Sequence, residues 1–363
     1  MLRALPQRLI CPSCRDPRSE LRTHVFRDGS DGHVRDGVLV CGACHEWYPI
    51  EDDVLEFVPS DMLYPDDAIA FQQRFAGELA AIGCEPHEIA LIPQPDRGEP
   101  EHADQRKQRD HFDRYAESLE PGFQDYTRSV FIQAASARFA DLWKARLGGP
   151  ESWILDIGCG TAISSFPFAD RHVVAGFDIS KKAIRRDTEE ARARGLMAKT
   201  TFFVADGAFL AFKDESFRFA QTFGALHHLP NPAQAVKDIV RILEPGGIYF
   251  GVENNKTAFR WIFDLMMKVK PLWVEEAGAE PLISAAMVRE WAAGLPVEVH
   301  CETSVFLPPH LFNALGLDAA RALLDWSDRA CLHVPWLRAN GGQLVYAVRK
   351  TSRQPDAAAG PAA

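Results

Sequence analysis

Four of the eight cysteines stand in two closely spaced pairs, Cys11-Pro12-Ser13-Cys14 and Cys41-Gly42-Ala43-Cys44. A C-x2-C turn can direct both of its thiolates at one tetrahedral Zn²⁺, and two such turns complete the coordination. The 26 residues between the pairs leave room for two hairpin strands, which we expect at 21–26 and 37–40. Because four thiolates leave zinc no open position, the sequence predicts a structural metal site at Cys11, Cys14, Cys41 and Cys44.

A glycine turn follows a short apolar run in the segment Ile154-Leu155-Asp156-Ile157-Gly158-Cys159-Gly160-Thr161. The run at 153–157 predicts a buried parallel strand. Glycines without a Cβ let the backbone turn tightly and lie against a bound molecule. Open α/β sheets bind ligands at the carboxyl ends of their strands, so this turn is a candidate ligand site.

Two acidic residues close the next expected strands. Asp178 ends an apolar strand at 173–177, and Asp206-Gly207 ends a third strand at 201–205. An acid at the end of the second strand is placed to accept hydrogen bonds from ribose hydroxyls. A dinucleotide fingerprint requires a third glycine at position 163, which is Ile163, so a nicotinamide or flavin cofactor is disfavoured.

Helices alternate with these strands. Ser180 is placed as the N-cap of a helix that runs to Arg194, with Gly195 as its stop. A fourth strand at 217–223 precedes a helix that begins at Asn231-Pro232, and a fifth strand is expected at 248–252 after a turn. This alternation predicts an α/β protein with a doubly wound, Rossmann-like parallel sheet.

Five ordered segments of residues 110–253 resemble the class I S-adenosylmethionine-dependent methyltransferases, close to the group that contains the quinone-biosynthesis methyltransferases. These segments are 155–161, Asp178, 205–207, 225–229 and 243–247. The resemblance implies that Asp156, Gly158 and Gly160 line the methionine end of the cofactor. It also implies that Asp178 holds the ribose and that Asp206, with Gly207, receives the adenine amino group. Family members often carry glycine where this chain has Ala162.

The same resemblance places the methyl group beside His227 and His228, at the end of the fourth strand. An acceptor oxygen of high pKa needs a base, and a histidine can supply one. The alternative is that the two histidines only shape the cofactor pocket. Glu253, at the end of the fifth strand, is a second candidate for the base.

Residues 8–59 resemble a small zinc-ribbon family whose eukaryotic members activate methyltransferases that act on transfer RNA and translation factors. The resemblance rests on the cysteine pairs, Tyr48-Pro49-Ile50 and an acid-rich strand up to Phe57. Because the ribbon is fused to a catalytic domain in one chain, the resemblance implies an intramolecular scaffold. We therefore expect a small N-terminal β-rich zinc ribbon beside the methyltransferase sheet.

The chain divides into a ribbon at 1–59, a helical segment and linker at 60–109, a methyltransferase domain at 110–350 and a disordered tail at 351–363. The linker is expected around the proline-rich stretch 93–100. An acceptor-side insertion at about 254–340 contains an apolar helix at 257–269, followed by 271–273. This helix could pack in the core, cover an apolar acceptor as a lid, or lie on a membrane surface. Strands are expected at 297–306 and 343–348, separated by a helix at 311–328, and the resemblance to the methyltransferases implies that they form an antiparallel edge.

Composition bears on the acceptor and on location. A net charge of −10 gives no general attraction to phosphate backbones, which argues against nucleic acid. No apolar run is long enough to span a bilayer, and the first ten residues lack the apolar core of a secretory signal, so we expect a cytoplasmic protein. The sequence thus favours a small-molecule or lipid-like acceptor.

Two other functions stay open. Some ribosomal-RNA guanine methyltransferases also carry an N-terminal zinc ribbon, so the chain could methylate ribosomal or transfer RNA. Such an enzyme would be expected to show a basic groove. A catalytically silent binding module that keeps the fold is the second alternative, and cofactor binding would argue against it.

Overall fold

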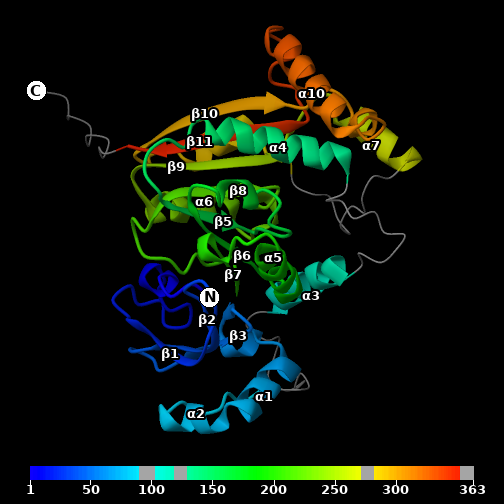
Figure 1. The fold of residues 1–363 in the computed structure, drawn as a ribbon. Coiled ribbons are helices and arrows are strands. Elements are labelled where there is room, and N and C mark those ends of the chain that lie inside the picture. Colours follow the sequence, from blue (N-terminus) through cyan, green and yellow to red (C-terminus); the bar gives the residue numbers. More distant parts are fainter. Residues whose placement is uncertain (90–102, 118–128, 271–281, 352–363) are drawn as a thin grey trace, which may run out of the picture. The chain divides into compact units, whose positions relative to one another are not determined.

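The computed structural model describes residues 1–89, 103–117, 129–270 and 282–351 (Figure 1). The predicted linker at 93–100, the segment 271–273 and the tail from 352 onwards lie outside the described residues. The chain forms two compact units, which are described separately. Unit 1 comprises Met1–Ser118 and Val174–Lys213, and unit 2 comprises Leu119–Val173 and Asp214–Ala363.

Unit 1 contains a six-stranded sheet in the order β1-β2-β3-β4-β7-β6. Its strands are β1 Leu21–Asp28, β2 Val34–Cys41, β3 Trp47–Glu51, β4 Val54–Phe57, β6 Val173–Asp178 and β7 Thr200–Ala205. The strands β1 to β4 pair antiparallel and form the ribbon, as predicted. The strand β4 pairs with β7 in parallel, with Leu55 opposite Phe203, so the ribbon continues the sheet that carries β6 and β7.

The helices of unit 1 are α1 Pro65–Arg74, α2 Ala76–Ala81, α3 Ala103–Glu117 and α5 Lys181–Ala193, with short 3-10 helices η1 Leu5–Arg8, η2 Ser60–Met62 and η6 Met197–Lys199. The α5 helix begins and ends as predicted. Ser180 Oγ accepts a hydrogen bond from Ala183 N at 3.1 Å, and Gly195 has φ +68° after the last turn. The helices α1 and α2 are separated at Phe75, whose ring packs against Phe71 and Phe26 over the ribbon.

Unit 2 contains five strands in the order β5-β8-β9-β11-β10. They are β5 Trp153–Ile157, β8 Phe217–Phe223, β9 Leu243–Asn254, β10 Val297–Ser304 and β11 Gln343–Lys350. The strands β5, β8 and β9 are parallel, and β11 and β10 add an antiparallel edge, as predicted. The strand β9 begins at Leu243, earlier than predicted, because Leu243 pairs with Phe217 of β8. The next pair is Phe219 with Ile248, so residues 244–247 form an irregularity in the register of β9.

The helices of unit 2 are α4 Val130–Lys144, α6 Pro232–Ile242, α7 Arg260–Val269, α8 Ala285–Trp291, α9 Pro309–Phe312 and α10 Leu317–Leu332, with η5 Phe166–Phe168 and η7 Leu226–His228. The ring of Trp143 on α4 stacks on that of Phe250 on β9, with 4.6 Å between the ring centroids. The helix α4 also packs against α10 (Figure 1). The helix predicted at 311–328 is two helices, because Gly316 takes an extended conformation before α10.

The predicted fold class is confirmed: a Rossmann-like α/β sheet with an antiparallel edge and an N-terminal β-rich ribbon. Among the described residues, every helix is too short or too polar to cross a lipid bilayer. The division into four segments stays a prediction.

Candidate cofactor, metal and acceptor sites

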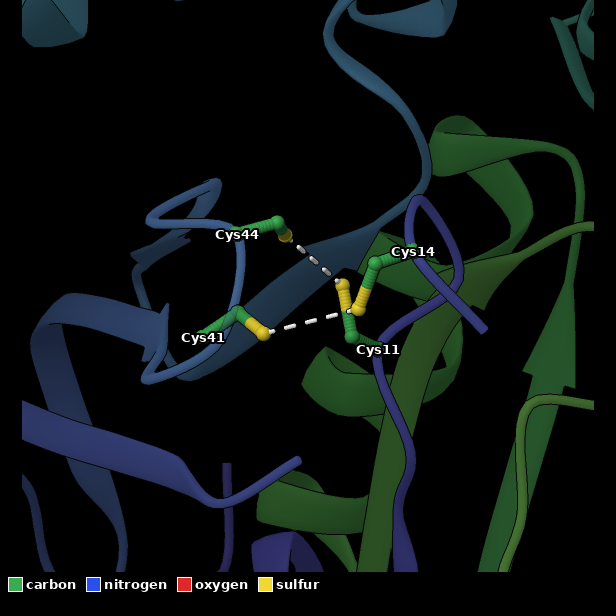
Figure 2. A group of neighbouring side chains, drawn as sticks. All are labelled: Cys11, Cys14, Cys41 and Cys44. Atoms are coloured by element: carbon green, nitrogen blue, oxygen red, sulfur yellow. Dashed lines mark hydrogen bonds between the residues drawn. The ribbon is translucent and has the colours of Figure 1, made fainter. Parts of the chain in front are cut away.

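The four cysteines of the two C-x2-C turns converge on one point of unit 1 (Figure 2). Their sulfur atoms all lie within 4.8 Å of one another. The Sγ atoms of Cys11 and Cys44 are 3.6 Å apart, and those of Cys14 and Cys41 are 3.8 Å apart. Tetrahedral zinc with Zn–S bonds of about 2.3 Å requires sulfur–sulfur distances of about 3.8 Å. The arrangement therefore fits zinc, and a four-thiolate set closes its coordination.

Both cysteine turns are built in the same way. Arg15 N donates to Cys11 O and His45 N donates to Cys41 O, each at 3.0 Å. Arg15 and His45 both have positive φ, of 54° and 63°, which turns the chain away after the second cysteine of each pair. The buried phenol of Tyr48 lies 3.0 Å from Cys11 Sγ and so supports a ligand atom directly.

Substituting one ligand is expected to release the metal. The chain purified with zinc should contain one zinc atom per molecule by elemental analysis, and Cys41→Ser should contain far less, because a closed four-thiolate site loses most of its affinity with one ligand. Chelation of the unsubstituted chain should expose the amides of β1 to β4 to hydrogen exchange before those of unit 2. Full zinc content in the Cys41→Ser chain would contradict this assignment.

The two acidic candidates of unit 1 lie at one edge of its sheet. Asp178 ends β6 opposite Val204, and Asp206 directly follows the end of β7 at Ala205. Each carboxylate orients its own turn: Asp178 Oδ1 accepts from Ser180 N at 3.0 Å, and Asp206 Oδ1 accepts from Ala208 N at 2.8 Å. Both residues and Gly207 are half-buried. The structure thus brings the predicted ribose and adenine acids to neighbouring strand ends.

The glycine turn of unit 2 has left-handed backbone at each of its predicted key positions. Gly158 and Gly160 have φ of +65° and +56°. A Cβ on Gly158 would lie 2.8 Å from Ala225 Cβ, whereas a Cβ on Gly160 would meet nothing within 4 Å. The first glycine is therefore required by a contact within the protein as well as by its φ. Ala162 also has a positive φ, of 47°, a backbone conformation that glycine adopts more readily than alanine.

Asp156 is fully buried within a polar network of unit 2. Its Oδ2 accepts hydrogen bonds from Gln221 Nε2 at 2.6 Å, from Ser164 Oγ at 3.4 Å and from Ser165 Oγ. This network ties β5 to β8 and to the segment after the glycine turn. A carboxylate held in this way fixes the shape of the turn, and its predicted role at the methionine end of the cofactor stays a prediction.

His227, on η7 after β8, and Glu253, near the end of β9, form a buried pair. His227 Nδ1 lies 2.5 Å from Glu253 Oε2, and Glu253 Oε1 accepts from Leu226 N at 2.8 Å. Both side chains are buried, and His228 is half-buried with its ring 3.9 Å from that of His227. The carboxylate favours the tautomer with a proton on Nδ1, so Nε2 is the basic nitrogen of the neutral ring. The sequence indicates Glu253 only as a second candidate for the base, because spacing along the chain does not show its pairing with His227.

The acceptor-side segment exposes most of the large apolar side chains at the surface of the described residues. Of ten such side chains, nine lie between residues 259 and 336. On α7 they recur every four residues, with Trp261, Leu265 and Val269 exposed by 63%, 56% and 81%. Only the opposite side of α7 is buried, at Met267. A helix inside a core would not expose such a stripe, so core packing does not describe α7.

Two family models match the chain. Residues 155–251 match the model described as a methyltransferase domain, and residues 7–53 match the model described as Trm112p-like protein. The first covers most of β5 to β9 with the glycine turn, both acids and His227, and ends two residues before Glu253. The second covers both cysteine pairs.

Three relatives illustrate the range of similar proteins. The 27-O-demethylrifamycin SV methyltransferase of Amycolatopsis mediterranei is 29% identical over 140 residues, which cover 37% of this chain and 50% of that protein. Norajmaline N-methyltransferase of Rauvolfia serpentina is 29% identical over 201 residues, 50% of this chain and 67% of that protein. Sterol 24-C-methyltransferase erg6 of Aspergillus fumigatus is 34% identical over 145 residues, 39% of this chain and 35% of that protein. The chain thus spans between about a third and two thirds of these relatives.

Proposed function

We propose that this chain transfers a methyl group from S-adenosylmethionine to a small-molecule or lipid-like acceptor, because it matches the models of a methyltransferase domain and of a Trm112p-like protein. The match of residues 155–251 to the methyltransferase domain is the observation that carries the proposal. The sulfonium of the cofactor supplies an activated methyl group, so the protein mainly has to bind and align.

The predicted binding residues support this assignment within each unit. In unit 1, Asp178 and Asp206 hold their turns at adjacent strand ends, where a nucleoside needs acceptors for its hydroxyl and amino groups. In unit 2, Gly158 and Gly160 adopt the left-handed backbone of the turn, and their lack of side chains leaves this backbone open to a bound molecule. We assign Asp178 to the ribose, Asp206 and Gly207 to adenine, and Asp156, Gly158 and Gly160 to the methionine end.

We further propose that His227 accepts the proton of the acceptor and that Glu253 positions it. The hydrogen bond from His227 Nδ1 to Glu253 fixes the ring and leaves Nε2 as the basic atom. An imidazolium formed during transfer would be stabilised by the adjacent carboxylate. His228, whose ring lies 3.9 Å from that of His227, is assigned to shaping the pocket.

A small or lipid-like acceptor fits the surface of the acceptor-side segment. An exposed apolar stripe on α7 offers contacts to an apolar molecule, and a lid needs such a surface. The names of the three relatives specify a demethylrifamycin, norajmaline and a sterol, all of them small molecules. They differ in the atom that is methylated, so the acceptor class is the finest level that this similarity supports.

The ribbon is proposed to act as an internal scaffold for the catalytic domain. Its strand β4 pairs with β7, and Ile10 N donates to Ala211 O at 3.0 Å. The first contact reaches the strand that precedes Asp206, and the second reaches the segment that follows it. A free activator would have to form such contacts in a second binding event, whereas fusion in one chain makes them intramolecular.

The acceptor class can be tested by following a labelled methyl group. Purified protein with radiolabelled S-adenosylmethionine and a cell extract is expected to place label in the solvent-extractable fraction, since the acceptor is small and apolar. The same reaction with Asp178→Ala should place little label anywhere, because loss of a ribose contact weakens cofactor binding by about 1–3 kcal/mol. Label in ribosomal or transfer RNA would instead establish the RNA methyltransferase alternative. A chain that binds no cofactor in calorimetry would be a silent module.

A further inference from the structure

The zinc-binding turn lies against the segment that follows the predicted adenine acid. This segment, residues 206–213, is called the adenine loop below. Ile10 N donates to Ala211 O at 3.0 Å, Lys213 N donates to Arg8 O at 2.9 Å, and Leu9 forms an antiparallel bridge with Phe212. The next residue after Ile10 is the ligand Cys11. The pairing therefore ends directly at the metal site.

A second contact leaves the other end of the same turn. Arg15 follows the ligand Cys14, and its guanidinium lies over the ring of Phe209 at 4.5 Å. Arg15 N donates to Cys11 O at 3.0 Å, and Arg15 has φ +54°, so its position is set by the closed cysteine turn. The residues on either side of the first cysteine pair thus both hold the adenine loop.

The two ends of the adenine loop differ in how firmly the rest of unit 1 fixes them. Phe212 is buried, and its ring packs against Phe177 and Phe203 in the core of β6 and β7. Phe209 is only half-buried and lies three residues after Asp206. The Arg15 contact therefore acts on the end of the loop that carries the predicted adenine acid.

We propose that the zinc-bound turn at Cys11–Cys14 positions the adenine loop, so that zinc and cofactor binding strengthen each other. This inference rests on the proposed assignment of Asp206 to the adenine. Metal bound by all four cysteines holds the turn closed, and the closed turn places Arg15 over Phe209. Any such coupling is reciprocal. If bound zinc raises the affinity of the chain for S-adenosylhomocysteine, the product of the cofactor, then bound S-adenosylhomocysteine raises the affinity for zinc by the same factor.

The test uses the full-length, zinc-loaded chain and S-adenosylhomocysteine as the probe. Calorimetry should show about two- to fivefold weaker binding in Arg15→Ala, the effect of one exposed cation–π contact, with one zinc per chain retained. Arg18→Ala is the matched control, because Arg18 is on the same segment and its side chain is 90% exposed. It should bind as the unsubstituted chain does. Phe209→Leu removes the other partner, and combined with Arg15→Ala it should add little further loss.

The reciprocal arm measures zinc transfer to a chromogenic chelator. S-adenosylhomocysteine should slow zinc loss from the unsubstituted chain and should have a smaller effect in Arg15→Ala. Equal affinities in Arg15→Ala and Arg18→Ala, with zinc loss indifferent to the probe, would overturn the coupling and leave the cofactor assignment standing. A zinc-loaded, folded chain that binds no S-adenosylhomocysteine would overturn the proposed function, and the coupling with it.

Discussion

Replacing Glu253 with glutamine is expected to lower methyl transfer by about two to four orders of magnitude, the usual range for loss of a positioned base. Leu226 N requires an acceptor at the Oε1 position, so the amide oxygen of the new glutamine should stay there. Its NH2 group would then face His227 Nδ1 and favour the tautomer with the proton on Nε2. The ring would keep its place but present a donor where a base is needed.

The measurement separates this role from a merely structural one. S-adenosylhomocysteine affinity and melting temperature should change little in Glu253→Gln, while turnover falls and its dependence on pH changes shape. His227→Asn should show a similar loss of turnover, and His228→Asn a smaller one. If the histidines only shape the cofactor pocket, cofactor affinity and turnover should fall together in His227→Asn. That outcome would remove His227 from proton transfer.

Local sequence signals were sufficient for most of the catalytic sheet. The strands β5 and β8 have the predicted bounds, and the caps at Ser180 and Asn231 start the helices that they were expected to start. These signals depend on a residue and its near neighbours: apolar runs, capping side chains and a glycine after the last turn. The start of β9 was missed because pairing across a register shift with Phe217 overrides the Pro-Gly-Gly pattern.

The attachment of the ribbon could not be predicted in this way. Parallel pairing joins Leu55 to Phe203, which are far apart in the chain. Neither strand contains a sequence pattern that identifies the strand with which it pairs. One signal was available and not used. Glu56 stands alone as a charge within the apolar strand Val54–Phe57, and a charge in a buried strand requires a partner. The partner is Lys181, the first residue of the helix expected after Ser180.

The sequence predicted which residues belong to the site, but it did not predict the hydrogen bonds and packing contacts among them. Asp156, Gly158 and Gly160 were chosen for a ligand, yet Asp156 is held by Gln221, and a side chain on Gly158 would strike Ala225. Sequence spacing places residues at strand ends, but it does not show which side chains satisfy one another across strands. The His227–Glu253 pair could not be predicted for the same reason, since it links the segment after β8 to the end of β9.

The second large effect is expected from the buried ion pair that ties the ribbon to α5. Lys181 Nζ binds a carboxylate oxygen of Glu56 and lies 2.6 Å from Asp67 Oδ2. Lys181 is 2% exposed and Glu56 is 5% exposed. Lys181→Met should lower the free energy of unfolding by about 3–5 kcal/mol, because it leaves Glu56 buried without its cation. Lys182→Met, an exposed neighbour, should change it by less than about 0.5 kcal/mol.

The dependence on pH and a double variant show whether the uncompensated charge is the cause. Burial already raises the pKa of Glu56 against the opposing effect of Lys181, and loss of Lys181 should raise it further. When an acid has a higher pKa in the folded than in the unfolded state, its contribution to the free energy of unfolding is largest below the unfolded-state pKa. This contribution is lost as the pH rises through the folded-state pKa. The deficit of Lys181→Met in chemical unfolding should therefore shrink as pH falls from 7 towards 5.

Lys181→Met combined with Glu56→Leu should recover much of the lost stability, since two apolar side chains of suitable size replace a buried ion pair at little cost. A deficit that is independent of pH and persists in the double variant would mean that packing around α5, and not charge, joins the ribbon to the catalytic sheet. In that case Glu56 would be tolerated in β4 for reasons other than its pairing with Lys181.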